Sequence, residues 1–388
     1  MMPLDGVRVL DLSRLIAGNM LTMLLADFGA DVIKIEQPGV GDTLRGWRVA
    51  DQQLYWQVYG RNKRSVTLDL KSAAGHELLL RLVDTADVLV ESFRPGALEQ
   101  MGLGWTVLHE RNPRLVYLPI SGWGRTGSMA QRPGFGTLVE ARSGFAATNG
   151  FPDREPVLPP LALADMVAGV YGAYATTLAL RHAADGGEGQ IVDLSLFEAL
   201  FSIMGPVAAV YETTGQVPAR SGNRSPTSAP RNIYRTSDDK WIALSATTQS
   251  MFVRLAAAIG RPGMVDDPRY RTNEVRLDNV EELDKAIGEH FAERTLVQSL
   301  HDLDEAGVTA TAVDDIAGLI DSEFFLSRAV LTRSPAAHPD EPGTAMADVV
   351  PRLSASPGSV RSAAPELGQH NAEVLKPLLS EQEWEALR

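Results

Sequence analysis

The sequence of 388 residues contains no cysteine. The chain therefore cannot form disulfides, use a thiolate nucleophile, or bind an iron–sulfur cluster or a cysteine-based zinc ion. Its seven histidines form neither an H-x-x-x-H nor an H-E-x-x-H pattern, so we expect no metal site. A G-x-S-x-G nucleophile elbow is also missing, which argues against a serine hydrolase of the α/β class.

Long apolar runs are lacking as well, and we expect no secretory leader, because the first residues show neither a basic stretch nor a continuous apolar one. The longest apolar stretches, residues 15–25 and 166–180, are interrupted by polar residues and glycine and fall short of the ~18 apolar residues of a membrane span. Positive charge is scarce: 36 Lys and Arg stand against 49 Asp and Glu, a net charge of −13. Such a balance disfavours a general nucleic-acid binder. We expect a cytoplasmic protein that binds neither membranes nor nucleic acids.

The first 120 residues alternate short β-branched runs with helical patterns. This alternation indicates βαβ units and a mostly parallel sheet, so the fold class is α/β. Ligands of such sheets bind beyond the carboxyl ends of the strands, near a switch in strand order. The loops after Leu12, Glu36 and Glu91 are therefore the first candidates for a site. The predicted strands cover residues 7–12, 31–36, 65–70, 87–91 and 115–120.

Basic residues gather in the loops that follow these strands. In an acidic protein this placement favours an anionic ligand, and the forked donors of arginine suit phosphate groups. The alternative is that they are ordinary charges paired with scattered carboxylates. The residues are Arg14, Arg45, Arg48, Arg61, Lys63, Arg64, Lys71 and Arg94.

A glycine-rich string at residues 122–127 matches G-x-G-x-x-G and follows a predicted strand. A dinucleotide fingerprint also requires the third glycine to open a helix. Pro133 and Gly134 follow soon after, and they would break such a helix. The string therefore predicts a glycine loop and not a nicotinamide or flavin site.

Asp165 is the most informative single residue, because it is the only charged side chain between Glu155 and Arg181. One interpretation is purely structural: aspartate is a preferred helix cap, and a helix is predicted from Met166. The other is catalytic, since a carboxylate at a helix amino terminus stays ionised and apolar neighbours strengthen it as a nucleophile. The two interpretations are compatible.

Ordered segments along nearly the whole chain resemble one known family. They are residues 4–12 with 17–18, 24–36, 62–65 with 68–71, 91–96, 121–124, the Asp165 segment and 365–370. Together they are similar to the class III CoA-transferases, a family that also includes 2-methylacyl-CoA racemases. The resemblance implies that Asp165 attacks an acyl-CoA thioester and passes through aspartyl anhydride and aspartyl-CoA thioester intermediates. It implies no cofactor beyond coenzyme A as co-substrate.

The resemblance also implies where the substrates bind. Coenzyme A would lie along the strand-end loops. The segment 132–160 resembles members that act on short or dicarboxylic acyl groups such as succinyl-CoA, and Arg125, Arg142 and Asn149 are candidates to orient the acyl group. Gln37 and Gln100 stand where some members carry arginine. The implied CoA contacts are Arg14, Leu15, Ile16, Gln37, Leu68, Lys71, Ser92, Phe93, Arg94 and Gln100.

The family fold implied is a Rossmann-like large domain with a smaller inserted α/β domain. A Pro-, Ser- and Gly-rich stretch at residues 218–230 marks the best candidate linker. We expect the large domain over 1–215, the linker over 216–230, the small domain over 231–330, and a return to the large domain over 331–388. Two such ring-shaped protomers would interlock as a homodimer.

Three alternative functions remain open at this stage. A 2-methylacyl-CoA racemase is disfavoured because Phe135 stands where that branch carries a histidine, and proton exchange on both faces of a carbon acid needs both partners. An intramolecular transferase of the mesaconyl-CoA type would use the same aspartate. A non-catalytic CoA-binding protein is the third.

Overall fold

The computed structural model describes residues 1–336 and 342–387. By their contacts the residues form two compact units. The first comprises Met1–Phe145, Leu158–Val207 and Arg328–Arg388, and the second comprises Ala146–Val157 and Ala208–Ser327. The chain thus leaves the first unit twice, over residues 146–157 and 208–327, and returns to it for the last time near its carboxyl end. Residues 146–157 and 208–215, which we expected in the large domain, belong to the second unit.

The first unit is built on a sheet of six parallel strands in the order β3-β2-β1-β4-β5-β6. This is the Rossmann order, which reverses between the neighbours β1 and β4. The α/β class and the parallel sheet are confirmed. The loops after β1 and β4 lie at the switch point. The strands are β1 (Arg8–Leu12), β2 (Asp31–Glu36), β3 (Lys63–Thr67), β4 (Val88–Glu91), β5 (Val116–Ser121) and β6 (Leu194–Ser195).

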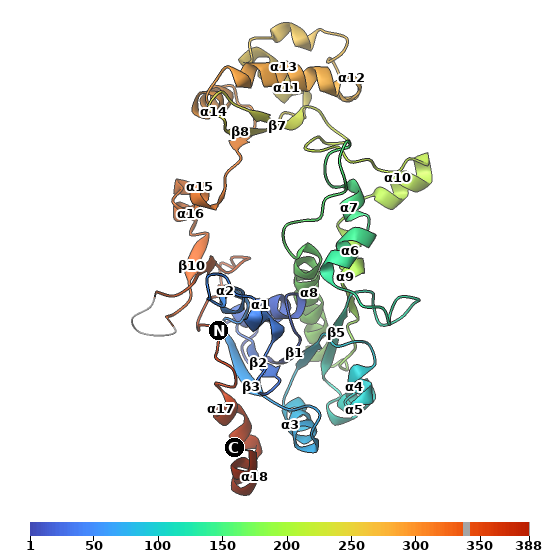
Figure 1. Ribbon diagram of the computed structural model, residues 1–388, viewed down its shortest axis with the longest axis vertical. Coiled ribbons are helices and arrows are strands. Elements are labelled where there is room, and N and C mark those ends of the chain that lie inside the picture. Colours follow the sequence, from blue (N-terminus) through green and yellow to red (C-terminus); the bar gives the residue numbers. More distant parts are fainter. Residues whose placement is uncertain (337–341, 388) are drawn as a thin grey trace. The chain divides into compact units, whose positions relative to one another are not determined.

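Helices cover both faces of this sheet. Since alternate residues of a strand point to opposite sides, each face of the sheet has its own apolar core. Val9, Val90 and Leu118 face a core that includes α1 and α8, whereas Leu10, Ile33 and Leu89 face α3 and α5. Figure 1 shows α1 and α8 on one side of the strands and α3 on the other. The helices are α1 (Ala17–Asp27), α3 (Ala73–Val83), α4 (Ala97–Gln100), α5 (Trp105–Arg111) and α8 (Leu163–Ala184).

The helix around Asp165 is longer than predicted. It begins at Leu163 and not at Met166, so Asp165 lies in its first turn, and the N-cap residue is Ala162 with no side-chain cap. By length and composition alone, α8 is long and apolar enough to span a membrane, a criterion that the core helix of a soluble protein can also meet. In this structure, 33% of its apolar 18-residue segment is buried. The sequence did not predict this because Gly169, Tyr171 and Gly172 interrupt the apolar run.

Shorter elements complete the first unit. The carboxyl-terminal segment pairs with the edge strand β3, where the Ser65 N–H donates to His370 Nδ1 and the His370 N–H to the Ser65 carbonyl oxygen. These elements are η1 (Thr43–Gly46), α2 (Leu54–Tyr59), α6 (Gly136–Arg142), α9 (Leu196–Ser202), β10 (Leu331–Arg333), β11 (Ala345–Ala347), α17 (Asn371–Leu375), η3 (Lys376–Leu378) and α18 (Glu381–Leu387). The short helix α7 (Phe145–Thr148) belongs, apart from its first residue, to the second unit.

The second unit has its own core around the antiparallel strands β7, β8 and β9. Only the middle strand was predicted, since β7 lies directly after the proline-rich stretch. The elements are α10 (Val207–Thr214), β7 (Arg231–Arg235), β8 (Trp241–Ser245), α11 (Gln249–Ala258), η2 (Pro262–Val265), α12 (Asn273–Asp278), α13 (Val280–Ala292), α14 (Leu296–Glu305), β9 (Ala310–Ala312), α15 (Ile316–Ile320) and α16 (Glu323–Arg328).

Candidate active site

Asp165 lies in a tight, largely buried setting. A Cβ added at Gly136, the first residue of α6, would come within 2.1 Å of Asp165 Oδ2, so only glycine leaves room for the carboxylate. Glu140 on the same short helix is also buried, and its Oε1 accepts the Ala164 N–H at 3.1 Å. The partner of the Glu140 carboxylate is thus the amino end of α8.

Burial raises the pKa of Asp165, and the nearby Glu140 carboxylate raises it further, to about 6. The backbone N–H groups of Asp165 and Ala17 act in the opposite direction by donating to the carboxylate. We had expected the helix terminus to keep this group firmly ionised. The structure corrects that expectation, because desolvation and a like charge outweigh the backbone donors. The group is still mostly ionised at neutral pH.

A cavity of about 440 Å³ opens onto this carboxylate, and we call it the Asp165 cavity. The loop after β1 contributes Arg14 and Leu15, and the loop after β4 contributes Ser92, Phe93 and Arg94. Asp165 is the only acidic residue among the described residues that line it. The glycine loop supplies Gly122 and Trp123, and the segment facing it supplies Arg132, Pro133, Gly134 and Phe135.

A second cavity of about 390 Å³ lies along the ends of β1, β2 and β3, and we call it the strand-end cavity. Gln37, Leu68 and Lys71 line it, as expected for residues of these loops. Arg14, Thr43 and Phe93 line both cavities, so the two are neighbours. An extended ligand could therefore pass from the strand ends to the Asp165 carboxylate.

Glu91 holds the loop after β4 in place. Glu91 ends that strand, and its Oε2 accepts the Phe93 N–H at 2.6 Å while its Oε1 accepts the Tyr117 hydroxyl at 2.9 Å. Burial raises the pKa of Glu91 to about 7. The Ser92 hydroxyl oxygen accepts the Arg14 N–H at 2.9 Å, which ties the two switch-point loops together.

Comparison with known proteins agrees with this geometry. The model of CoA-transferase family III matches residues 4–371. The chain belongs to CoA-transferase family III. It is 40% identical to the succinyl-CoA–D-citramalate CoA-transferase of Chloroflexus aurantiacus, over 97% of this chain and 94% of that protein. It is 35% identical to the succinate–glutarate CoA-transferase of Agrobacterium fabrum, over 97% and 96% of the two chains.

A solved structure gives the same result. A CaiB/BaiF family protein from Brucella suis superposes with a TM-score of 0.86 at 31% identity, covering 97% of this chain and 100% of that one. The sequence-based assignment to the class III CoA-transferases is confirmed, and the protein is an enzyme of that family. The CoA-transferase site must then accommodate an acyl-CoA and a carboxylic acid.

The structure divides most basic residues of the strand-end loops of this family III enzyme into two groups; Arg48, which donates to the Asp51 carbonyl oxygen, belongs to neither. One group forms internal ion pairs, such as Arg45 with Glu36 at 2.7 Å and Lys63 with Asp11 at 3.1 Å. The other group has no carboxylate partner among residues 1–336 and 342–387 and lines the cavities. Its members are Arg14, Lys71, Arg94 and Arg132.

Five sequence-predicted site residues lie outside both cavities. Ile16 is buried against Leu44 and Trp56, and Gln100 is exposed beside the cavity residue Met101. The other three are the substrate candidates. Arg125 is bound by Glu99 at 2.5 Å, Arg142 is exposed at the end of α6, and Asn149 donates to the Val157 carbonyl oxygen within the second unit.

Proposed function

We propose that the protein transfers coenzyme A from an acyl-CoA to a carboxylic acid, with Asp165 as the nucleophile. The observation that carries this proposal is the position of Asp165: its carboxylate is the acidic group lining a cavity that adjoins the strand-end cavity. The loops of the Rossmann switch point are shared by both. A thioester delivered along the strand ends would meet this carboxylate.

The reaction proceeds by exchange at two carbonyl carbons. An Asp165 oxygen attacks the thioester carbon, the C–S bond breaks, and the CoA thiolate leaves an aspartyl–acyl anhydride. The thiolate then attacks the Asp165 carbonyl carbon, which releases the donor acid as a carboxylate and leaves an aspartyl-CoA thioester. An acceptor carboxylate reverses both steps. Each step exchanges one anion for another, so no net proton transfer is needed.

We propose dicarboxylic acids as substrates, with succinyl-CoA as a donor. The relatives from Chloroflexus and Agrobacterium are named for succinyl-CoA, citramalate, succinate and glutarate. Arg94 and Arg132 line the Asp165 cavity without a carboxylate partner in the described part of the chain. Since guanidinium groups bind carboxylates in a bidentate manner, either can hold the distal carboxylate of such an acid. They replace Arg125, Arg142 and Asn149 as candidates for this role.

We propose a homodimer for this CoA-transferase, in line with the interlocked rings implied by the resemblance. The support here is α8, whose small residues pack inward while Val170, Tyr174 and Leu178 are 52%, 61% and 53% exposed. An apolar helix face of this kind is typical of a surface covered by a partner.

Two alternatives use the same cavity. Racemisation needs a second acid–base group, and no histidine lines the Asp165 cavity among the described residues. Intramolecular transfer between two carboxyl groups of one acid requires only Asp165. Mesaconyl-CoA incubated without an acceptor acid would reveal it by isomerisation.

The proposal is tested by Asp165→Asn in an exchange assay with succinyl-CoA and a panel of short mono- and dicarboxylates. We expect loss of exchange while CoA binding, measured by calorimetry, is retained. Hydroxylamine added with succinyl-CoA should convert Asp165 of the wild type to a hydroxamate detectable by peptide mass spectrometry. Asp185→Asn, at the opposite end of α8 and exposed, is the matched control. Unchanged exchange by Asp165→Asn would overturn the nucleophile assignment.

A further inference from the structure

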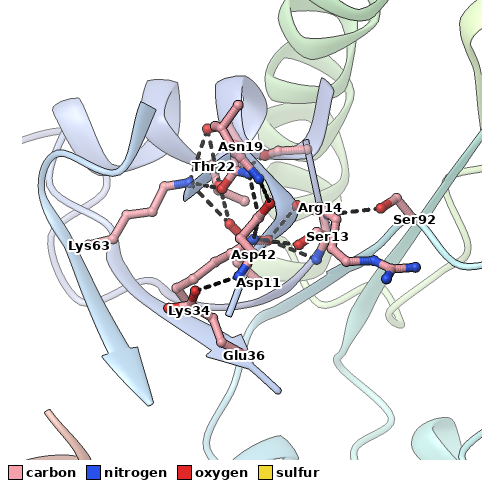
Figure 2. A network of polar contacts seen from close by, with 12 residues as sticks. Asp11, Ser13, Arg14, Asn19, Thr22, Lys34, Glu36, Asp42, Lys63 and Ser92 are labelled. Atoms are coloured by element: carbon pink, nitrogen blue, oxygen red, sulfur yellow. Dashed lines mark hydrogen bonds and ion pairs between the residues drawn. The ribbon is translucent and has the colours of Figure 1, made fainter. Parts of the chain in front are cut away.

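A buried cluster of charges lies next to the loop after β1 (Figure 2). Lys34 from β2 and Lys63 from β3 both contact the Asp11 carboxylate, with Nζ–Oδ distances of 3.2 and 3.1 Å. All three side chains are fully buried. Burying such charges carries a desolvation penalty that their attraction need not exceed. Stability alone is therefore a weak reason for this cluster.

Asp42 connects the cluster to the loop. Its Oδ2 lies 2.9 Å from Lys34 Nζ and accepts Asn19 Nδ2 at 2.7 Å, while its Oδ1 accepts the Leu15 N–H at 3.1 Å. The same Asn19 Nδ2 donates to the Leu15 carbonyl oxygen at 2.6 Å. Both polar backbone groups of Leu15 are thus bound by Asp42 and Asn19. Lys34 Nζ and the Asp11 carboxylate bind the backbone of Ser13 in the same loop.

Leu15 needs this support because its backbone is left-handed, with φ +63°. A leucine rarely adopts this conformation unless its surroundings enforce it. Ala17 begins α1 two residues later, and its backbone N–H lies near enough to the Asp165 carboxylate to lower the pKa of that group. Leu15, Ala17 and Asp165 line the same cavity. The turn at Leu15 therefore determines where the Ala17 N–H points.

We propose that Asp42 is a positioning residue for the CoA transfer: by holding Leu15 in its left-handed turn, it aims the Ala17 N–H at the Asp165 carboxylate. This inference rests on the proposed role of Asp165. When the CoA thiolate attacks the Asp165 carbonyl carbon of the anhydride, negative charge moves onto the Asp165 oxygen. A backbone N–H already aimed at that oxygen stabilises the oxyanion without rearrangement.

The test is Asp42→Asn, studied by steady-state kinetics over pH. The new amide would direct donors at Lys34 and at the Asn19 amide, so the side chain must turn and release the N–H groups of Leu15 and Leu44, which share Asp42 Oδ1. We expect kcat to fall about tenfold to a hundredfold, below the ~10²–10³ cost of removing an oxyanion donor entirely. The KM for succinyl-CoA should stay within about threefold, because the Ala17 N–H stabilises the transition state and contributes little to binding of the substrate.

The pH profile separates positioning from a plain change of charge. Losing the Ala17 donor raises the pKa of Asp165, so the acid limb of kcat/KM should move to higher pH. Removing a negative charge alone would move it to lower pH. The groups facing Asp165 are left in place: Glu140 on α6, Tyr59 on α2, and the guanidinium groups that line the cavity. The proposal is overturned if the acid limb of kcat/KM stays in place or moves to lower pH while kcat is unchanged.

Two further variants keep the test decisive. Thr22→Val removes the 2.6 Å bond from Thr22 Oγ1 to Asp11 within the same cluster but does not touch Leu15, so the acid limb should stay. If Asp42→Asn does not fold, Asn19→Ala releases the Leu15 carbonyl oxygen and should raise the limb. A wild type that forms no hydroxamate at Asp165 refutes the proposed function. A wild type that forms it, with normal kinetics in Asp42→Asn, refutes only the positioning role.

Discussion

At the scale of single residues, the site depends on how Asp165 is surrounded. Gly136 leaves space for its carboxylate, Glu140 places a second negative charge beside it, and the backbone N–H of Ala17 lowers its pKa. Ala17 lies far in the sequence from the other two neighbours, which share α6. Gly136 and Ala17 carry no functional signal in the sequence, since one has no side chain and the other acts through its backbone. Their effect on the nucleophile is nevertheless direct, because they set its pKa and orientation.

The pKa of about 6 for Asp165 predicts a pH dependence of activity. The nucleophile must be ionised, so kcat/KM should fall as the pH drops through about 6. In Glu140→Gln the like charge is gone while an oxygen can still accept the Ala164 N–H. The pKa of Asp165 should fall, and the acid limb should move to lower pH. An acid limb that stays in place would show that another group controls it.

Arg132 is predicted to set the preference for dicarboxylic acids. Its segment is fixed because Gly134 packs against Gly122 and the Trp123 Nε1–H donates to the Pro133 carbonyl oxygen at 3.1 Å. Arg132→Gln should raise the KM for succinate about tenfold to a hundredfold, since bonds to charged groups contribute ~1.5–3 kcal/mol. The KM for acetate should not change. If Arg142→Gln raised the KM for succinate and Arg132→Gln did not, Arg142 would again be the candidate for orienting the acyl group, as expected from the sequence.

At the scale of elements, the β1, β2 and β3 strands are joined by charges as well as by the backbone ladder. Burial alone would raise the pKa of Asp11, but Lys34, Lys63 and the hydroxyls of Ser13 and Thr22 lower it to about 2. Because this folded value lies below the unfolded one, the group contributes stability above about pH 4. That contribution is lost as the pH falls through about 2.

Asp11→Ala should therefore destabilise the fold strongly at pH 7. It leaves two buried ammonium groups without their shared carboxylate, and breaking a buried pair costs about 3–5 kcal/mol. Asp84→Ala is the control, because the Asp84–Arg111 pair is about two-fifths exposed and such pairs contribute about 0–1 kcal/mol. Urea unfolding curves measure both. Equal losses of unfolding free energy in the two variants would contradict the prediction that Asp11 stabilises the fold more than the exposed Asp84–Arg111 pair does.

At the scale of the whole molecule, the two units differ in how the chain builds them. The first unit needs the carboxyl-terminal residues, since Asn371 and His370 bind the edge strand β3. The apolar face of α8 gives this unit a surface suited to a second copy of the chain. Exposed Val170, Tyr174 and Leu178 on one helix would otherwise be costly in water.

The proposal of an interlocked homodimer predicts a mass of twice 41.9 kDa in sedimentation. Interlocked rings cannot separate without unfolding, so the mass should persist on dilution. Two differently tagged preparations should exchange subunits only after denaturation and refolding. Free exchange under native conditions would contradict interlocking, and a mass of 41.9 kDa would contradict the dimer. The paired variant Tyr174→Arg, Leu178→Glu should lower the yield of dimer.

Much of the fold follows from the sequence itself. The β-branched runs gave β1, β2 and β4 nearly to the residue, because buried parallel strands leave a strong local pattern. Ser72 caps α3 as its position suggests, with its hydroxyl accepting the Gly75 N–H. β9 and β7 were missed since they are short or follow a proline-rich stretch. The start of α8 was misplaced because apolar Leu163 and Ala164 carry no boundary signal.

The amino-acid sequence by itself determined the α/β class, the absence of thiol chemistry, the strand-end loops and the prominence of Asp165. These features depend on local patterns and on residue chemistry. Tertiary structure alone decided which arginines are free and which are paired, that Glu140 lies beside Asp165, and that Asp42 holds Leu15. The last two facts depend on contacts between residues 24 and 27 positions apart. For the arginines, the energy of a charge depends on its burial and its neighbours.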